Sequence, residues 1–191
     1  NGAYCYNVNE KKWTNYLHDE NNPRSLPYDK VLSIFEDSHR QIWLTTQGGG
    51  FCKFHPETET FTSYDSRNGL PNDVVYQIVE DKEGLMWLTT NNGLVSFQPA
   101  TGAMKVYTTA NGLLGEQFNY RSSFETEDGT IYLGSIDGFV AFNPKNFSEN
   151  KSLPSIVITD FLLFGKEVYP GDPSSPLKKS INFLDELVLQ P

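Results

Sequence analysis

The chain has 191 residues, of which 14% are aromatic, and its formal net charge is −9. This length is enough for one sizeable domain, or for one domain and part of another. The acidic charge gives no electrostatic footprint for nucleic acid, so we expect no nucleic-acid partner. The longest apolar stretch, 156–164, is far shorter than the roughly 20 residues that span a bilayer, so we expect no direct membrane insertion.

The first predicted element is half of a sequence unit that recurs further along the chain. Residues 1–16 repeat the glycine and aromatic positions of the segment 50–64: Gly2, Tyr6, Trp13 and Tyr16 match Gly50, Phe54, Phe61 and Tyr64. This copy lacks the first two strands of the unit, so we expect the chain to be a piece of a longer protein.

Two full units follow, at 26–64 and 68–107. Both contain a Glu-Asp pair, a Trp-Leu-Thr-Thr string and a glycine that opens the next strand. The unit recurs about every 44 residues, which lies within the range of propeller blades. The repeat positions that we interpret as structural are Asp37, Trp43 and Gly50 in the first full unit, and Asp81, Gly84, Trp87 and Gly93 in the second.

A third copy lies at 111–147, where Gly129, Tyr132 and Gly138 occupy three of the same repeat positions. Each unit predicts four strands, which in the second unit are 74–80, 85–90, 93–97 and 103–107. Asn92-Gly93 is a strong hairpin signal between two of these strands. No segment of ten or more residues keeps the helical period, so we expect almost no helix.

The regular self-copying favours a propeller over a β-sandwich, which would also have short strands but no such repetition. We therefore predict an all-β fold: a partial β-propeller of about three and a half four-stranded blades over residues 1–147. A broken ring leaves open edges, so we expect self-association through those edges or as a sensor homodimer.

The repeated acids and aromatic residues have structural interpretations. Asp37 and Asp81 are expected to close the turn between the first two strands by accepting backbone N–H groups, with a calcium site as the alternative. Trp43, Trp87 and Tyr132 are expected to pack between neighbouring blades, with a stacking platform for sugars as the alternative.

Catalytic chemistry finds no support in the sequence. His18, His39 and His55 are far apart, and no nucleophile elbow, phosphate loop or zinc-protease motif occurs. Cys5 and Cys52 have neither disulfide-framework nor metal-ligand spacing, so we interpret them as free thiols. We predict no metal, no cofactor and no enzymatic activity in this chain.

The segment 68–107, NGLPNDVVYQIVEDKEGLMWLTTNNGLVSFQPATGAMKVY, resembles the two-component regulator propeller repeat. The copy at 26–64 departs from that pattern, because Arg40 replaces the turn glycine and the glycine loop is longer. The segment 111–147 resembles the last blade of such sensors. Residues 148–191 resemble a linker and the first strands of the immunoglobulin-like three-tyrosine domain that follows it.

This resemblance implies the periplasmic sensor region of a Bacteroidetes-type hybrid histidine kinase, with the kinase outside this chain. Many such sensors respond to oligosaccharides. We expect a ligand on the face that carries the blade connections, since amides, an arginine and a tyrosine suit hydroxyl-rich ligands. The candidate residues are Gln47, Asn72, Asp73, Asn91, Asn92, Asn119, Tyr120, Arg121 and Asp137.

Three alternatives remain open from the sequence. The Asn and Asp residues of that face are also ordinary turn formers. The whole protein could be a propeller enzyme, either a glycosidase or a quinoprotein-like dehydrogenase. It could also be a scaffold propeller that binds other proteins.

Overall fold

A computed structural model describes residues 1–147, 157–172, 175–184 and 186–187. The chain divides into two compact units, Asn1–Ser148 and Glu149–Pro191, and each is described by itself. Among the described residues, no helix is long and apolar enough to cross a membrane.

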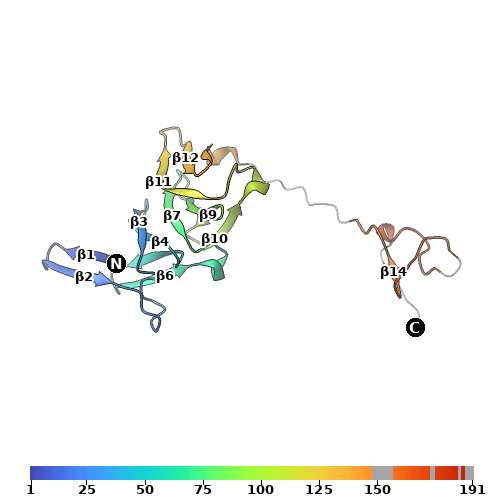
Figure 1. Cartoon of the computed structure of the whole chain (residues 1–191), viewed down its shortest axis with the longest axis horizontal. Coiled ribbons are helices and arrows are strands. Elements are labelled where there is room, and N and C mark those ends of the chain that lie inside the picture. The colour runs from blue at the N-terminus through green and yellow to red at the C-terminus, as the bar shows by residue number, and fades with distance from the viewer. Residues whose placement is uncertain (148–156, 173–174, 185, 188–191) are drawn as a thin grey trace. The chain divides into compact units, whose positions relative to one another are not determined.

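The first unit consists of successive antiparallel sheets, which we number as blades (Figure 1). Blade 1 is a hairpin of β1 (Ala3–Asn7) and β2 (Lys12–Tyr16). Blade 2 has four strands in sequence order: β3 (Val31–Glu36), β4 (Ile42–Thr46), β5 (Phe51–His55) and β6 (Thr60–Tyr64).

Blade 3 repeats this arrangement with β7 (Val75–Glu80), β8 (Met86–Thr90), β9 (Leu94–Gln98) and β10 (Ala103–Tyr107). Blade 4 contains β11 (Phe118–Glu125), β12 (Ile131–Ser135) and β13 (Gly138–Phe142). Within the described residues this sheet has three strands, one fewer than the repeat predicts. The predicted all-β partial propeller is confirmed.

Helix in the described residues is confined to 3-10 segments of three residues each, at Ser66–Asn68, Thr109–Asn111, Pro144–Asn146 and Ile181–Phe183. The first two begin the connections between blades. Each has a capping box, in which Asp65 or Thr108 accepts a backbone N–H and the Asn three residues later bonds back. The Asn-Gly-Leu motif of the repeat therefore ends a helical turn.

The hydrophobic cores lie between the blades. The first strand β7 contacts β3 on one side and β11 on the other. The faces of neighbouring sheets pack against each other beyond these first strands. Trp43 of blade 2 presents its ring edge-on to Phe97 of blade 3, with 5.7 Å between centroids. Trp87 makes the same kind of contact with Phe142 of blade 4 at 4.7 Å. Blades 2 and 3 therefore each bury their tryptophan against the next blade.

The repeated aspartate joins the turn to this tryptophan. Asp81 is 6% exposed, and its Oδ1 accepts the backbone N–H groups of Glu83 and Leu85, both at 3.0 Å. Its Oδ2 accepts the indole N–H of Trp87 at 2.9 Å. Asp37 makes the equivalent bond to Trp43 at 2.8 Å. The turn role follows from the sequence, but the bond to the indole does not.

Blade 4 departs from this pattern in two linked positions. Thr126 replaces the aspartate and bonds only to its own turn, accepting the N–H of Thr130 at 3.1 Å. Tyr132 replaces the tryptophan, is 38% exposed, and has its ring contact with Phe139 of its own sheet. The expected packing of Tyr132 between blades is therefore not seen among the described residues.

The glycine before the third strand is required by the fourth strand. Gly50 and Gly93 have φ of 71° and 103°, and an added Cβ would lie 2.0 Å and 2.7 Å from the carbonyl oxygens of Tyr64 and Tyr107. Gly138 has no atom within 4 Å of that position, in keeping with the three-stranded sheet. The glycine thus lets the third and fourth strands approach closely.

The second unit pairs β14 (Leu162–Leu163) with β15 (Lys166–Glu167). The predicted linker lies mostly in 148–156, outside the described residues. Assignment of the remainder to an immunoglobulin-like domain stays a prediction.

Candidate functional site

Asp73, one of the predicted ligand residues, holds two blades together. Its carboxylate accepts the backbone N–H of Ser66 at 2.7 Å and the Ser66 hydroxyl at 3.1 Å. Its carbonyl oxygen accepts the N–H groups of Gly48 and Gly50, at 3.0 and 2.8 Å. The residue therefore clips the start of a blade connection to the third strand of the preceding blade.

The same clip recurs at the other connections. Glu116 accepts the N–H and the hydroxyl of Thr109, both at 2.9 Å, and its carbonyl oxygen accepts the N–H of Gly93 at 2.6 Å. These bonds from Thr109 lower the pKa of Glu116. The carbonyl oxygen of Asp29 accepts the N–H of Gly2 at 2.7 Å. The acids at these three connections therefore serve the fold.

Other predicted ligand residues also take part in turns. Asn72 accepts the N–H of Val74 at 2.8 Å, and the N–H of Asn92 bonds to Thr90 at 3.0 Å. Gln47 donates its backbone N–H to Lys30 at 3.0 Å. Asp137 is exposed and lies beside Gly115, whose added Cβ would be 2.5 Å from the carboxylate.

The remaining predicted residues gather around an enlarged bulge in β11. In blades 2 and 3 the first strand has a one-residue bulge, at Leu32 and at Tyr76. In blade 4 the pairing passes from Phe118↔Ser135 to Ser123↔Leu133. The residues without a partner in that stretch of β11, all opposite Gly134 alone, are Asn119, Tyr120, Arg121 and Ser122.

Small residues and local hydrogen bonds make room for this bulge and close it. An added Cβ on Gly134 would lie 2.7 Å from Cβ of Ser122. The Ser122 hydroxyl donates to the carbonyl oxygen of Asn119 at 2.9 Å, and the Asn119 amide donates to Ser135 at 2.8 Å. Asn119 therefore serves the bulge itself, while bulges of this kind re-aim neighbouring side chains.

Tyr120, on the bulge, completes an aromatic and amide group. Its ring lies 4.6 Å from that of Tyr76, nearly perpendicular to it, and its side chain is 53% exposed. Tyr76 donates its hydroxyl to Oδ1 of Asn91 at 2.9 Å. Burial, and then the neighbouring Tyr120, raise the pKa of Tyr76. Two predicted residues, Asn91 and Tyr120, are thus joined by Tyr76, which the sequence analysis missed.

Arg121 is exposed at the edge of this group and has a positive φ of 49°. It borders two open depressions. One is lined by residues 31–34 of β3, and the other by residues of β11–β13 that include Phe124, Tyr132 and Phe139. The bulge therefore presents a guanidinium and a tyrosine ring to solvent beside the first strands of the blades.

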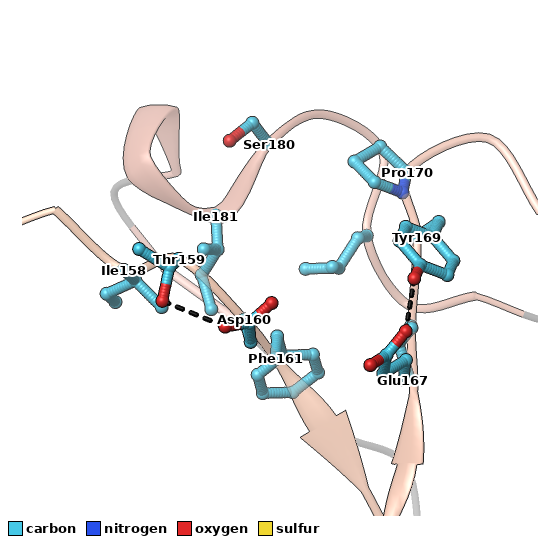
Figure 2. A pocket seen from close by; sticks show the side chains of 11 residues that line it. Ile158, Thr159, Asp160, Phe161, Glu167, Tyr169, Pro170, Ser180 and Ile181 are labelled. Carbon is cyan, nitrogen blue, oxygen red and sulfur yellow. Dashed lines mark hydrogen bonds between the residues drawn. The ribbon is translucent and has the colours of Figure 1, made fainter.

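A further pocket lies within the second unit, where Tyr169, Phe161 and Ile181 surround a small space (Figure 2). Four of the polar side chains that line it are already paired. The Thr159 hydroxyl donates to Asp160 at 2.9 Å, and the Tyr169 hydroxyl donates to Glu167. Glu167 raises the pKa of Tyr169. None of the predicted site residues lines this pocket, so the β11 bulge is the better candidate.

No group of three or more His, Cys, Asp or Glu side chains suited to a metal ion occurs in the part of the chain that the structure describes. The thiols of Cys5 and Cys52 are free, the first exposed and the second buried. The candidate site therefore offers hydrogen bonds, a stacking face and one positive charge. These are means of binding, and none of these groups is arranged as a nucleophile with its base.

The fold and its repeats define a class of protein, a β-propeller built from four-stranded units. Residues 69–92 match the two-component regulator propeller family. Histidine kinase P4 of Formosa agariphila is 34% identical over 154 residues, which are 80% of this chain and 11% of that protein. Residues 69–92 therefore carry a two-component regulator propeller repeat, as the sequence predicts, and the chain spans about a tenth of this curated relative.

Solved structures support the fold. The extracellular domain of a protein named as a hybrid two-component system of B. thetaiotaomicron aligns with a TM-score of 0.60 at 23% identity, over 75% of this chain and 20% of that one. PorZ of Porphyromonas gingivalis, a surface component of the type-IX secretion system, aligns at 0.54 and 14% identity, over 72% and 20%. At these identities the likeness concerns the fold alone.

Proposed function

We propose that this chain is part of the extracytoplasmic sensor propeller of a hybrid two-component histidine kinase, located in the periplasm. The observation that carries the proposal is the family repeat at 69–92 together with the histidine kinase relative that matches most of the chain. In this proposal the chain binds the signal and catalyses nothing, and the kinase lies elsewhere in the protein.

The proposed ligand is an oligosaccharide, bound at the β11 bulge. Tyr120 offers a half-exposed ring for stacking on a sugar face, and its neighbour Tyr76 holds Asn91 in place. Asn91 keeps its amide N–H groups for a sugar hydroxyl, because its Oδ1 is the atom bonded to Tyr76. Rings and directional amides are the usual means of recognising such ligands.

The test is calorimetry on the full-length protein with a panel of oligosaccharides, comparing the wild type with Tyr120→Ala. We expect loss of a stacking ring to weaken binding by about tenfold. Tyr28→Ala removes an exposed tyrosine elsewhere and is the matched control. Equal affinity in wild type and Tyr120→Ala would refute this site, and absence of any saccharide binding would refute the proposed ligand class.

A further inference from the structure

The charge of Arg121 is not neutralised by its surroundings. Its guanidinium makes no hydrogen bond or ion pair with any described residue, whereas Arg40 and Arg67 pair with Glu36 and Asp65. No carboxylate lines either depression that Arg121 borders. In a chain of net charge −9, this is an isolated positive site beside the candidate stacking ring.

Buried polar atoms lie behind the bulge. In blade 2, Ser33 and Thr45 bond to each other at 2.8 Å, and the Thr45 hydroxyl donates to the carbonyl oxygen of Tyr76 in the next blade at 3.3 Å. The equivalent pair in blade 3 is Gln77 with Thr89. Gln77 Nε2 and the Thr89 hydroxyl are buried and have no hydrogen-bond partner among the described residues.

The blade 2 geometry tells which way this pair faces. Since Thr45 reaches the bulge of the following first strand, Thr89 faces the bulge of β11. There, the enlarged loop replaces the simple bulge that supplies the carbonyl acceptor to Thr45. Buried donors normally have partners. Gln77, which is 6% exposed, therefore has a buried amide donor that no described residue satisfies.

From these observations we infer that the β11 bulge recognises an anionic saccharide, with the guanidinium of Arg121 paired to a carboxylate or sulfate ester of the sugar. This inference rests on the proposed function and narrows its ligand class. The guanidinium fork bonds such oxygens with two parallel N–H donors. Tyr120 stacks on the ring that carries the anion, and the unpartnered amide donor of Gln77 lies behind the bulge.

The experiment is calorimetry on the full-length protein with matched probes that differ in charge. Trigalacturonate is compared with its methyl ester, and a sulfated carrageenan tetrasaccharide with its desulfated form. We expect at least tenfold tighter binding of one charged probe than of its neutral partner, because a charge-assisted bond is lost in the latter. The preferred pair distinguishes a carboxylate from a sulfate, and the affinity of that probe is expected to fall as salt rises.

Two variants of Arg121 and one control variant test whether the charge preference depends on the Arg121 side chain. Arg121→Gln is expected to remove the difference between charged and neutral probes, while Arg24→Gln removes the same charge from an exposed position outside the bulge and is expected to retain it. Arg121→Lys is expected to show a charge preference between that of the wild type and that of Arg121→Gln, since it keeps the positive charge and loses the guanidinium fork.

The outcomes separate the two proposals. Tyr120-dependent binding with equal affinity for charged and neutral probes overturns this inference and leaves the proposed function standing. A charge preference that survives in Arg121→Gln also overturns it. Failure of every saccharide to bind counts against both proposals.

Discussion

Removal of the Asp81 carboxylate is expected to destabilise the interface between blades 3 and 4. Asp81→Ala deletes the acceptor of three hydrogen bonds, two from backbone N–H groups and one from the Trp87 indole. Bonds to a charged buried group contribute about 1.5–3 kcal/mol each, and the turn amides regain part of theirs from water, so we expect a loss of about 4 kcal/mol. Asp81→Asn keeps Oδ1 for the turn but places an amide donor against the indole, and is expected to lose about 2 kcal/mol.

Urea unfolding followed by fluorescence measures these losses, and a double-mutant cycle isolates the bond to the indole. Trp87→Phe removes the indole donor. The double variant Asp81→Asn/Trp87→Phe is therefore expected to lose less unfolding free energy than the two single variants added together, by at least about 1 kcal/mol. Asp37→Asn in blade 2 is the parallel case, since it breaks the equivalent bond to the indole of Trp43. Additive losses, or a loss below about 1 kcal/mol in Asp81→Ala, would refute the reasoning.

Arg40→Gly is expected to raise the free energy of unfolding by about 1 kcal/mol, because glycine adopts the φ of 62° without the strain that a side chain causes. Arg40→Ala keeps that strain, so an equal gain from both variants in urea unfolding would contradict this explanation. Burial raises the pKa of the Cys52 thiol to about 12, so a thiol reagent near neutral pH is expected to modify Cys5 alone until urea exposes the second thiol; rapid reaction of both in the native chain would contradict it. Phe139 is 63% exposed on the outer face of blade 4, so the chain 1–191 is expected to self-associate as its concentration rises, and Phe139→Ser is expected to self-associate less. Sedimentation measures this, and a monomer at every concentration would refute it.

Repetition makes the blades accessible to sequence analysis. The repeat predicts four strands at 74–80, 85–90, 93–97 and 103–107, and the structure places β7–β10 within one residue of those bounds. Each strand is marked by local signals, such as the Asn92-Gly93 turn, and each signal occurs in more than one copy. The turn role of Asp81 could be inferred for the same reason.

The hydrogen bonds between blades could not be predicted in this way. The bond of Gly50 to Asp73 joins residues from different sequence units, and no local pattern marks it. Asp73 therefore looked like a residue of an open loop, although both its carboxylate and its carbonyl oxygen are engaged. The bulge of β11 was also missed, since alignment of the third copy by its landmarks hides the unpaired residues between Phe118 and Ser123.

The clips at Asp29, Asp73 and Glu116 bear on how such rings change in size over evolution. Each clip joins the third strand of one blade to the connection that follows it, so the module that holds together spans the second half of one blade and the entry to the next. Duplication or loss of one whole period, wherever the break falls, always restores a complete clip at the new junction. Blade number can then vary without inventing new contacts, and one blade can change locally while its neighbours keep the repeat, as the enlarged bulge of β11 shows.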